Sequence, residues 1–270
     1  MSPTALEVLT SDGSPGSLPA GVAELRLTRP ELLNRFDEVL LDELGPALTS
    51  LAEDPGVRAV VWTSTGKHFS AGGDTEEILA SYRDPEHLSA GVERGKTLYR
   101  TFAGFTKPLV VALHGHTFGV ATSLVLLADA IVTTPSARLS DPHVHMALVA
   151  GDGGAISWSV NLPLIKAKRH LLWGEPLTGQ EAFDLGLVSD LVEDADKVRE
   201  VAVELAGRVA ALPPVAVQLT KATLNAGLAK RVDELLDVGF ANEAISNRTE
   251  DVVEAVTAFK EGRPGRWTGR

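Results

Sequence analysis

Two continuous apolar runs, each followed by a loop of small residues, most constrain the fold of this 270-residue chain. Arg58–Thr63 leads into Gly66–Asp74, and Lys107–Leu113 leads into His114–Gly119. An apolar run without polar alternation is typical of a strand that is buried on both faces, as in a parallel sheet. Parallel strands need long crossover connections, and the segments between these runs have helical spacing. The sequence therefore predicts an α/β fold.

Weaker signals extend this pattern on both sides. Val22–Leu27 alternates apolar and polar residues like a half-buried strand, and Ala130–Thr133 is a third buried run. The Gly, Ser and Pro residues between Asp12 and Gly21 predict a turn, and no strand is expected after Gly154. Helices are predicted near Phe36–Leu51, Thr75–Thr106, Val120–Leu127, Thr178–Gly186, Asp194–Leu212, Pro214–Leu228, Val232–Asn247 and Asp251–Lys260.

The composition excludes several classes of function. A formal net charge of -11 argues against a nucleic-acid or anionic-membrane partner. The absence of cysteine excludes disulfides and thiolate nucleophiles and fits a cytoplasmic location. The first residues lack the basic start and apolar run of a signal peptide, and no apolar run is long enough to span a bilayer. We expect a core over residues 1–195 and a helical region over residues 196–270 that packs on it or on another subunit.

Titratable residues are concentrated in Ser140–Gly154, which contains two histidines, two aspartates and a glycine turn. A carboxylate can orient an imidazole and raise its basicity, so His143 or His145 with Asp152 would make a general base. The alternative is a hydrogen-bonded structural histidine beside an ordinary turn. We interpret His145 as structural.

The two small-residue loops suggest a second chemical element. The backbone N–H groups of Gly73 and of Gly119 or Val120 are predicted to point into a cleft. Two such donors that converge on one carbonyl oxygen form an oxyanion hole. The alternative is that Ser70–Gly73 is simply a tight turn.

Several motifs in one order resemble the enoyl-CoA hydratase/isomerase, or crotonase, superfamily, over about Val22–Arg270. The resemblance implies a crotonase-like spiral of ββα units and a C-terminal helical trimerisation region, with a homotrimer or hexamer as the assembly. It also implies an acyl-CoA substrate, whose thioester oxygen the predicted oxyanion hole would bind, and no cofactor other than the coenzyme A of the substrate. The matching segments are Gly66–Asp74, Lys107–Gly115, Gly151–Gly154, Leu177–Ala182 and Gly186–Val188.

The resemblance also implies contacts to coenzyme A. Asn34-Arg35-Phe36 occupies the position where the superfamily commonly has Asn-Ala-Leu beside the coenzyme, so Arg35 is expected to meet a phosphate. A solvated arginine at a helix start is the alternative. Ala71 and Asp74, in the first loop, are the other expected coenzyme contacts.

The chain departs from this superfamily at its catalytic positions. Ser123 and His143 stand where typical hydratases have two glutamates, and Val120 and Ala121 stand where glycines are usual. We expect Ser123 to bond back to its helix backbone rather than act as a nucleophile.

Three candidate catalytic residues remain, namely His143, Asp152 and Glu243. This set is similar to that of a hydrolytic branch typified by 6-oxocamphor hydrolase, which cleaves a cyclic β-diketone in a retro-Claisen reaction. On that interpretation Asp152 orients His143, and His143 activates water.

Three functions therefore stay open at this point. The first is a hydratase-like lyase or isomerase that acts on an acyl-CoA thioester with His143 and Asp152 in place of the glutamates. The second is a β-diketone hydrolase, and the third is a non-catalytic protein that binds coenzyme A. Asp152 also matches the nucleophile of chlorobenzoyl-CoA dehalogenases, but 5% aromatic residues do not support the aromatic pocket that this chemistry needs. His114 and His116 could line the pocket, and no metal site is expected because no third ligand lies at suitable spacing.

Overall fold

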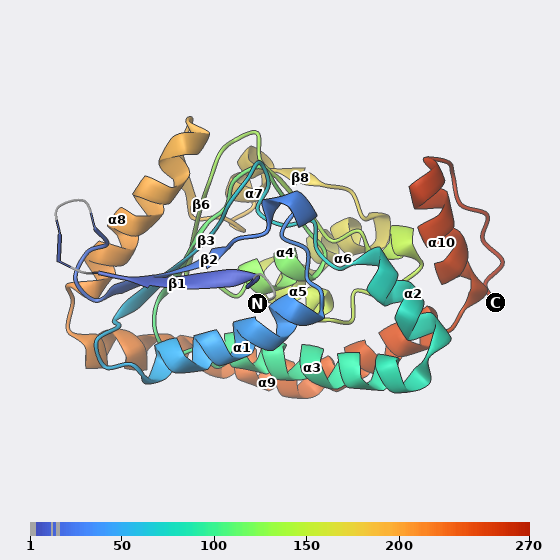
Figure 1. Cartoon of the computed structure of the whole chain (residues 1–270), viewed down its shortest axis with the longest axis horizontal. Coiled ribbons are helices and arrows are strands. Elements are labelled where there is room, and N and C mark those ends of the chain that lie inside the picture. Colours follow the sequence, from blue (N-terminus) through green and yellow to red (C-terminus); the bar gives the residue numbers. More distant parts are fainter. Residues whose placement is uncertain (1–3, 12, 15–16) are drawn as a thin grey trace.

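A computed structural model describes residues 4–11, 13–14 and 17–270, which form two sheets surrounded by helices (Figure 1). In the larger sheet β1 pairs antiparallel to β2 and every other pair is parallel. Its order is β1 (Leu6–Thr10), β2 (Val22–Leu27), β3 (Ala59–Ser64), β4 (Leu109–Ala112), β6 (Ala130–Thr133) and β9 (Asp190–Leu191). The smaller sheet contains β5 (His116–Phe118), β7 (Arg138–Ser140) and β8 (Leu177–Thr178). The prediction of an α/β fold is confirmed.

Ten α-helices connect and cover these strands among the described residues. Asp37 caps the first of them by accepting a hydrogen bond from the Leu40 N–H, and Thr178 and Glu181 form a capping box on α7. The helices are α1 (Glu38–Glu53), α2 (Thr75–Arg83), α3 (Pro85–Ala103), α4 (Val120–Val125), α5 (Gly154–Asn161), α6 (Leu164–Trp173), α7 (Gly179–Asp184), α8 (Val198–Ala210), α9 (Pro214–Asn247) and α10 (Glu250–Glu261).

The large sheet is buried on both faces, as the apolar runs predict. Alternate residues of a strand point to opposite faces, so Ala59 and Val61 of β3 pack with α8. Val60 and Trp62 face the other core, where Phe102 of α3 lies with its ring centroid 5.0 Å from that of Trp62. Figure 1 shows α1, α3 and α9 along this second side, with α8 on the first.

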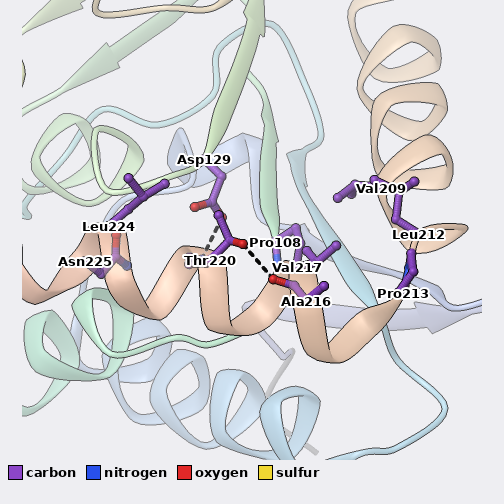
Figure 2. A pocket seen from close by; sticks show the side chains of 11 residues that line it. Pro108, Asp129, Val209, Leu212, Pro213, Ala216, Val217, Thr220, Leu224 and Asn225 are labelled. Atoms are coloured by element: carbon purple, nitrogen blue, oxygen red, sulfur yellow. Dashed lines mark hydrogen bonds and ion pairs between the residues drawn. The ribbon is translucent and has the colours of Figure 1, made fainter.

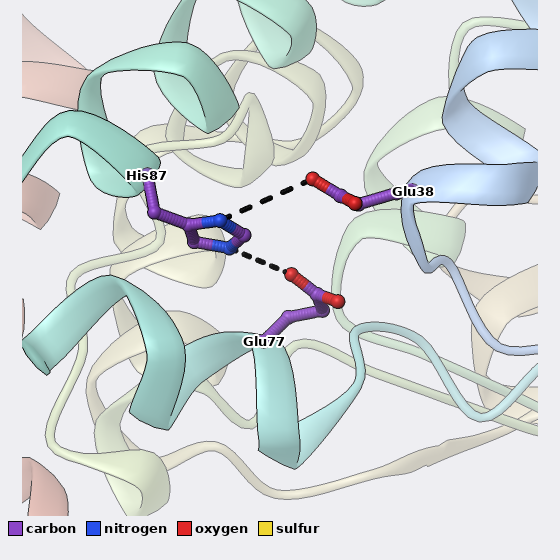
Figure 3. A group of neighbouring side chains, drawn as sticks. All are labelled: Glu38, Glu77 and His87. Carbon is purple, nitrogen blue, oxygen red and sulfur yellow. Dashed lines mark hydrogen bonds and ion pairs between the residues drawn. The ribbon is translucent and has the colours of Figure 1, made fainter. Parts of the chain in front are cut away.

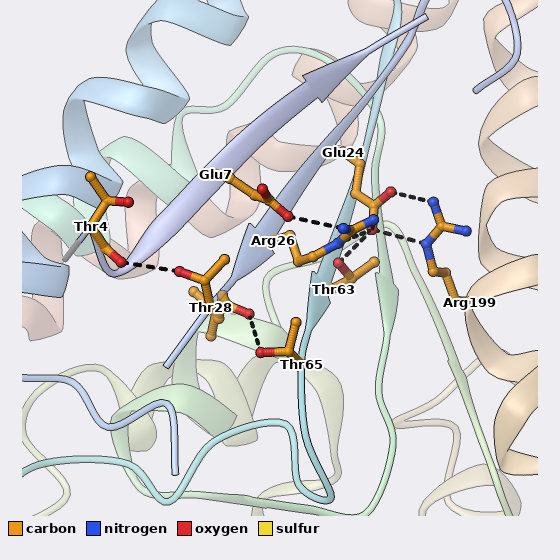
Figure 4. A network of polar contacts seen from close by, with 9 residues as sticks. Thr4, Glu7, Glu24, Arg26, Thr28, Thr63, Thr65 and Arg199 are labelled. Atoms are coloured by element: carbon orange, nitrogen blue, oxygen red, sulfur yellow. Dashed lines mark hydrogen bonds and ion pairs between the residues drawn. The ribbon is translucent and has the colours of Figure 1, made fainter. Parts of the chain in front are cut away.

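A buried carboxylate ties α8 to the sheet (Figure 4). Glu24 of β2 is fully buried and accepts hydrogen bonds from Thr63 at 2.7 Å, Arg26 at 2.9 Å and the Arg199 Nε at 3.0 Å. Burial opposes the ionisation of this carboxyl, but the hydrogen bonds and the charge of Arg199 hold the pKa of Glu24 at about 2.

Three sequence predictions of secondary structure are wrong. Strands do occur after Gly154, because β8 and β9 have two residues each and are too short to leave a pattern. The predicted turn at His114–Gly119 contains β5. The two helices predicted over Pro214–Leu228 and Val232–Asn247 are the single helix α9, since no helix-breaking residue separates them.

The two ends of the chain contain the predicted N-terminal turn and the last three helices, α8, α9 and α10. The predicted turn between Asp12 and Gly21 lies partly outside the described residues. α8 packs on the sheet, whereas α9 contacts α3 and α5, and α10 contacts α2. The division into residues 1–195 and 196–270 stays a prediction. Across the described ranges, no helix is both long and apolar enough to cross a membrane.

Candidate active site

The two glycine-rich loops lie directly against each other. Gly72 has φ +84°, and a Cβ there would lie 2.5 Å from the Phe118 carbonyl oxygen, so only glycine fits this contact. Ser70 pairs with Thr117 in a parallel bridge, which fixes the first loop to the start of the second. The structure therefore brings the predicted oxyanion residues to one place.

The backbone N–H groups of these loops are not equally available. The Gly119 N–H donates to the Ser140 carbonyl oxygen at 3.0 Å, so it is engaged within the fold. This contact corrects the prediction that named Gly119 as a possible donor. Neither the Gly73 N–H nor the Val120 N–H has a hydrogen-bond partner among the described residues. Gly73 and Val120 remain as the candidate pair.

His143 lies between two carboxylates. It begins a short 3₁₀ helix, His143–Met146, after β7. Its Nδ1 is hydrogen-bonded to the buried Asp141 Oδ1, and its Nε2 lies 3.2 Å from the Asp152 Oδ2. Burial alone would lower the pKa of His143, but the two carboxylates hold it well above its usual value of 6.5. The two carboxylates therefore favour the protonated form of the imidazole.

Asp141 is a candidate site residue that sequence reasoning missed. The sequence interpretation gave the orienting role to Asp152, but Asp141 occupies the Nδ1 side of His143 and is fully buried. Its position two residues before the histidine was the available signal. An Asp-Pro pair also reads as an ordinary turn, which conceals this role.

Glu243 reaches the site from the other end of the chain. It lies on α9, and its Cβ is 2.8 Å from the place where a Gly151 Cβ would stand. Burial and the charge of Asp152 raise the pKa of Glu243 to about 8, against the opposing effect of His143. The Glu243 Oε2 has no hydrogen-bond partner among the described residues. His143, Asp152 and Glu243 are therefore neighbours, as the sequence predicted, and their roles stay predictions.

A cavity of about 150 Å³ adjoins these groups. Val120 and Asp152 line it, whereas His143 does not. The carboxylate that faces the cavity is therefore Asp152, with His143 behind it and Asp141 behind His143. This order reverses the sequence interpretation, in which His143 faced the substrate. The other lining residues are Phe36, Leu41, Gly91, Gly95, Leu98, Tyr99, Leu124 and Phe240.

The three residues predicted to contact coenzyme A lie together at the first loop. The Arg35 Nη1 is 3.2 Å from the Asp74 Oδ2, and its Nε is 3.5 Å from the Asp37 Oδ2. Asp74 also caps α2 by accepting from the Glu76 N–H at 3.1 Å. Ala71 is exposed. The Arg35 charge is thus already paired with two carboxylates, and the coenzyme contacts stay predictions.

Other polar residues near the loops have structural contacts. The Ser123 Oγ donates to the Gly119 carbonyl oxygen one turn earlier at 3.4 Å, which confirms the expected bond back to the backbone. His114 bonds to the Gly66 carbonyl oxygen, and the ring of His116 packs on that of His68 with centroids 4.3 Å apart. The exposed His145 lies against Gly174.

A second hollow, of about 400 Å³, lies between α8 and α9 (Figure 2). Its lining is mostly apolar, as at Leu212, Val217 and Leu224. The charged Lys221 at its edge is bound to Asp129 at 2.6 Å. No predicted site residue lines this hollow, so the smaller cavity beside Asp152 is the candidate active site.

The sequence profile of the enoyl-CoA hydratase/isomerase family matches residues 17–270. The chain belongs to this family. Relatives in this family align with nearly the whole length of this chain. The 2,3-dehydroadipyl-CoA hydratase of Escherichia coli (strain K12) is 30% identical, over 91% of this chain and 94% of that protein. A probable enoyl-CoA hydratase of Bacillus subtilis (strain 168) is 29% identical, over 92% of this chain and 95% of that one.

Solved structures of the family confirm the predicted crotonase-like fold. An enoyl-CoA hydratase/isomerase from Mycobacterium paratuberculosis superposes with a TM-score of 0.87 at 32% identity, over 94% of this chain and 98% of that one. A β-diketone hydrolase from Anabaena sp. PCC 7120, bound to (S)-3-oxocyclohexyl acetic acid, superposes with a TM-score of 0.81 at 24% identity, over 91% and 94%. That second likeness shows the fold alone.

Proposed function

We propose that this family member is a hydratase or isomerase that acts on an acyl-CoA thioester. One observation carries the proposal: Asp152 and Val120 line the same cavity, and the Val120 N–H, a candidate oxyanion donor, has no hydrogen-bond partner among the described residues. A thioester oxygen held by the Gly73 and Val120 N–H groups would place its acyl carbons beside that carboxylate. Backbone donors of this kind stabilise the negative charge that develops on the oxygen.

Asp152 is the proposed general base. The Asp141 and Asp152 carboxylates favour the protonated form of His143, so we assign the base to Asp152, whose charge the imidazolium stabilises. Glu243, with a pKa of about 8, still carries its proton at pH 7. A carboxylate that lines the cavity and a protonated carboxyl next to that carboxylate suit the removal of a proton from an acyl carbon and its return elsewhere. The same base can activate a water for hydration.

The test compares conservative variants on crotonyl-CoA and a 3-enoyl-CoA ester. Asp152→Asn keeps the shape of the side chain and removes the base, so kcat is expected to fall by about a hundredfold or more. Coenzyme A thioesters should still raise the melting temperature of this variant, because ligands that bind only the folded state stabilise it. Wild-type protein that neither turns over any thioester nor gains thermal stability from one would refute the proposal.

A β-diketone hydrolase is the second candidate, favoured by one observation. Asp141, His143 and Asp152 form a continuous row, and His143 stands where the resemblance places one of the two glutamates of typical hydratases. Asp152 would remove a proton from water, the water oxygen would bond to a ring carbonyl carbon, and the adjacent carbon–carbon bond would break. The enolate released by that cleavage would then take up a proton. Hydrolysis of a 2,2-dialkylcyclohexane-1,3-dione with no thioester turnover would favour this candidate, and thioester binding without any turnover would indicate a non-catalytic protein.

We also propose a homotrimer, alone or paired as a hexamer. Large apolar side chains are exposed on α6 and on the first half of α9, such as Ile165 at 74% and Leu224 at 76%. Apolar surface of this extent marks a protein interface. A cytoplasmic location and the absence of any cofactor beyond the coenzyme A of the substrate stay predictions.

A further inference from the structure

The wall of the active-site cavity opposite Asp152 contains two glycines of α3. Gly91 and Gly95 are one turn apart, so they face the same side of the helix. A Cβ on Gly95 would lie 2.7 Å from the Phe240 ring, so that ring fills the space at Gly95. A Cβ on Gly91 would meet nothing within 4 Å. The open part of the cavity is therefore the space beside Gly91.

A charged cluster lies on the same face of α3 as Gly91, and Figure 3 shows its Glu38, Glu77 and His87 side chains. His87 and Arg94 stand on α3 about one turn before and one turn after Gly91, and Glu38 of α1 contacts both. The Glu38 Oε1 is 4.0 Å from the His87 Nδ1 and 2.5 Å from the Arg94 Nη2. Because Glu38 spans these two residues, its carboxylate lies over the turn of α3 that contains Gly91, just outside the lining of the cavity.

Glu77 of α2 completes the cluster by accepting from the His87 Nε2 at 2.8 Å. Both nitrogens of the His87 imidazole thus lie near a carboxylate oxygen. A histidine that binds a metal ion uses only one of its ring nitrogens as the ligand. The arrangement fits a network of ion pairs better than a metal site. An apolar chain that extended past Gly91 would displace or desolvate these charges, which is unfavourable.

The size and polarity of the cavity together define what fits. Its lining is mainly apolar, from Phe36, Leu41, Leu98, Leu124 and Phe240, and its volume is about 150 Å³. Apolar protein cavities of about this size hold one benzene molecule. Resting on the function proposed above, we propose that this enzyme takes compact acyl groups of about six carbons, cyclic or short and branched, and that the absence of a side chain at Gly91 leaves the space that they occupy.

The test uses thioesters that differ only in the acyl group. For the wild type, kcat/KM on cyclohex-1-ene-carbonyl-CoA and on a six-carbon enoyl-CoA should exceed that on a linear ten-carbon enoyl-CoA by about a hundredfold, since poor accommodation in an apolar pocket costs that much. Gly91→Leu should lower kcat/KM about a hundredfold for the ring substrate. The loss on crotonyl-CoA, with four carbons, should be much smaller than the loss on the ring substrate.

Ala90→Leu is the matched control. Ala90 precedes Gly91 on α3, but it is exposed and does not line the cavity. This variant should keep the wild-type preference among acyl groups. A wild type that prefers the ten-carbon chain, or a Gly91→Leu variant that keeps full activity on the ring substrate, would overturn the inference.

A binding measurement separates this inference from the proposed function. The benzoyl group of benzoyl-CoA should fill the cavity, and its binding does not require turnover. Calorimetry compares the affinity of the protein for benzoyl-CoA with its affinity for coenzyme A alone. Wild-type protein should bind benzoyl-CoA at least about tenfold more tightly, and Gly91→Leu should abolish that difference. If no thioester is turned over, the proposed function fails while this preference still supports the cavity assignment. Equal affinity for benzoyl-CoA and coenzyme A, or no binding of either, would overturn the cavity assignment.

Discussion

The backbone of Gly151 lies directly against the backbone of Gly239. A Cβ on Gly151 would lie 2.1 Å from the Gly239 carbonyl oxygen, and a Cβ on Gly239 would lie 2.6 Å from the Gly151 oxygen. This contact brings α9 against the turn that carries Asp152. Because Glu243 follows Gly239 by one helical turn, the same contact places Glu243 beside Asp152.

Gly239→Ala should therefore weaken both stability and activity. The added methyl group cannot fit unless α9 moves away from Gly151, and overpacking of this kind typically costs about 1–3 kcal/mol. Urea denaturation should show that loss in the free energy of unfolding. Gly45→Ala, on α1, where a Cβ would meet only the Leu98 Cδ1 at 4.0 Å, should instead gain about 1 kcal/mol from helix propensity. Similar effects of the two substitutions would contradict the close contact.

Asp141→Asn tests the role of the carboxylate at the Nδ1 of His143. Asp141 acts through His143, so we describe it as a positioning residue. Loss of its charge should lower the pKa of His143 towards its usual range, which nuclear magnetic resonance of the imidazole can measure. We expect kcat to fall by about a hundredfold. His145→Gln, an exposed neighbour, should change neither quantity. An unaltered His143 titration in Asp141→Asn would remove Asp141 from the mechanism.

The raised pKa of Glu243 predicts how stability depends on pH. The folded protein keeps this proton up to about pH 8, whereas the unfolded chain releases it near pH 4.5. The unfolded state therefore binds fewer protons across this interval, and the contribution of Glu243 to stability declines as pH rises from 4.5 to 8. Glu243→Gln removes that contribution, so its stability relative to the wild type should increase with pH. Urea denaturation at several pH values measures the difference, and a constant difference would contradict the assignment.

The same group predicts the basic limb of the activity profile. If Glu243 donates a proton, kcat/KM of the wild type should decline as pH rises through about 8. Glu243→Gln should be less active and should lack this limb. If kcat/KM of Glu243→Gln declines over the same pH range as that of the wild type, a group other than Glu243 causes the decline.

Much of the fold and part of the site were predictable from local sequence. The buried runs at Ala59–Ser64 and Leu109–Ala112 predicted parallel strands, because strands covered on both faces need no polar alternation. The proximity of His143 and Asp152 followed from the resemblance. Contacts that join distant segments were not predictable: the Gly119 N–H meets Ser140 only because β5 and β7 pair.

Glycines inside helices were the weakest signals. In the sequence, Gly239 and Gly91 look like ordinary interruptions of a helical pattern. In the structure, Gly239 brings α9 against the turn that carries Asp152, and Gly91 leaves the cavity open. Their meaning depends on what lies opposite them, which no local pattern contains. Asp141 was missed for a related reason: the Asp-Pro sequence is typical of a turn, whether or not the carboxylate is also hydrogen-bonded to a histidine.

Arg199→Met tests the connection between α8 and the sheet. Glu24 is fully buried, so loss of the two hydrogen bonds from Arg199 leaves its carboxylate with fewer partners. We expect the free energy of unfolding at pH 7 to fall by about 1–3 kcal/mol. In the wild type the stabilisation of ionised Glu24 is complete above pH 4.5 and is lost as pH falls towards 2. Acid titration of Arg199→Met should show a smaller loss in that interval, and identical acid profiles would contradict the connection.

Ile165→Glu tests the proposed assembly. Ile165 on α6 is 74% exposed and lies among the apolar residues Leu164, Leu172 and Trp173, which are also exposed. A charge buried in a subunit interface without a partner is strongly unfavourable, so the variant should dissociate the trimer. Light scattering coupled to size exclusion should give three or six times the chain mass for the wild type and one chain mass for the variant. Val8→Glu, at an apolar residue of β1 that is 42% exposed, should leave the assembly intact. A wild type that elutes as a single chain would refute the proposed trimer.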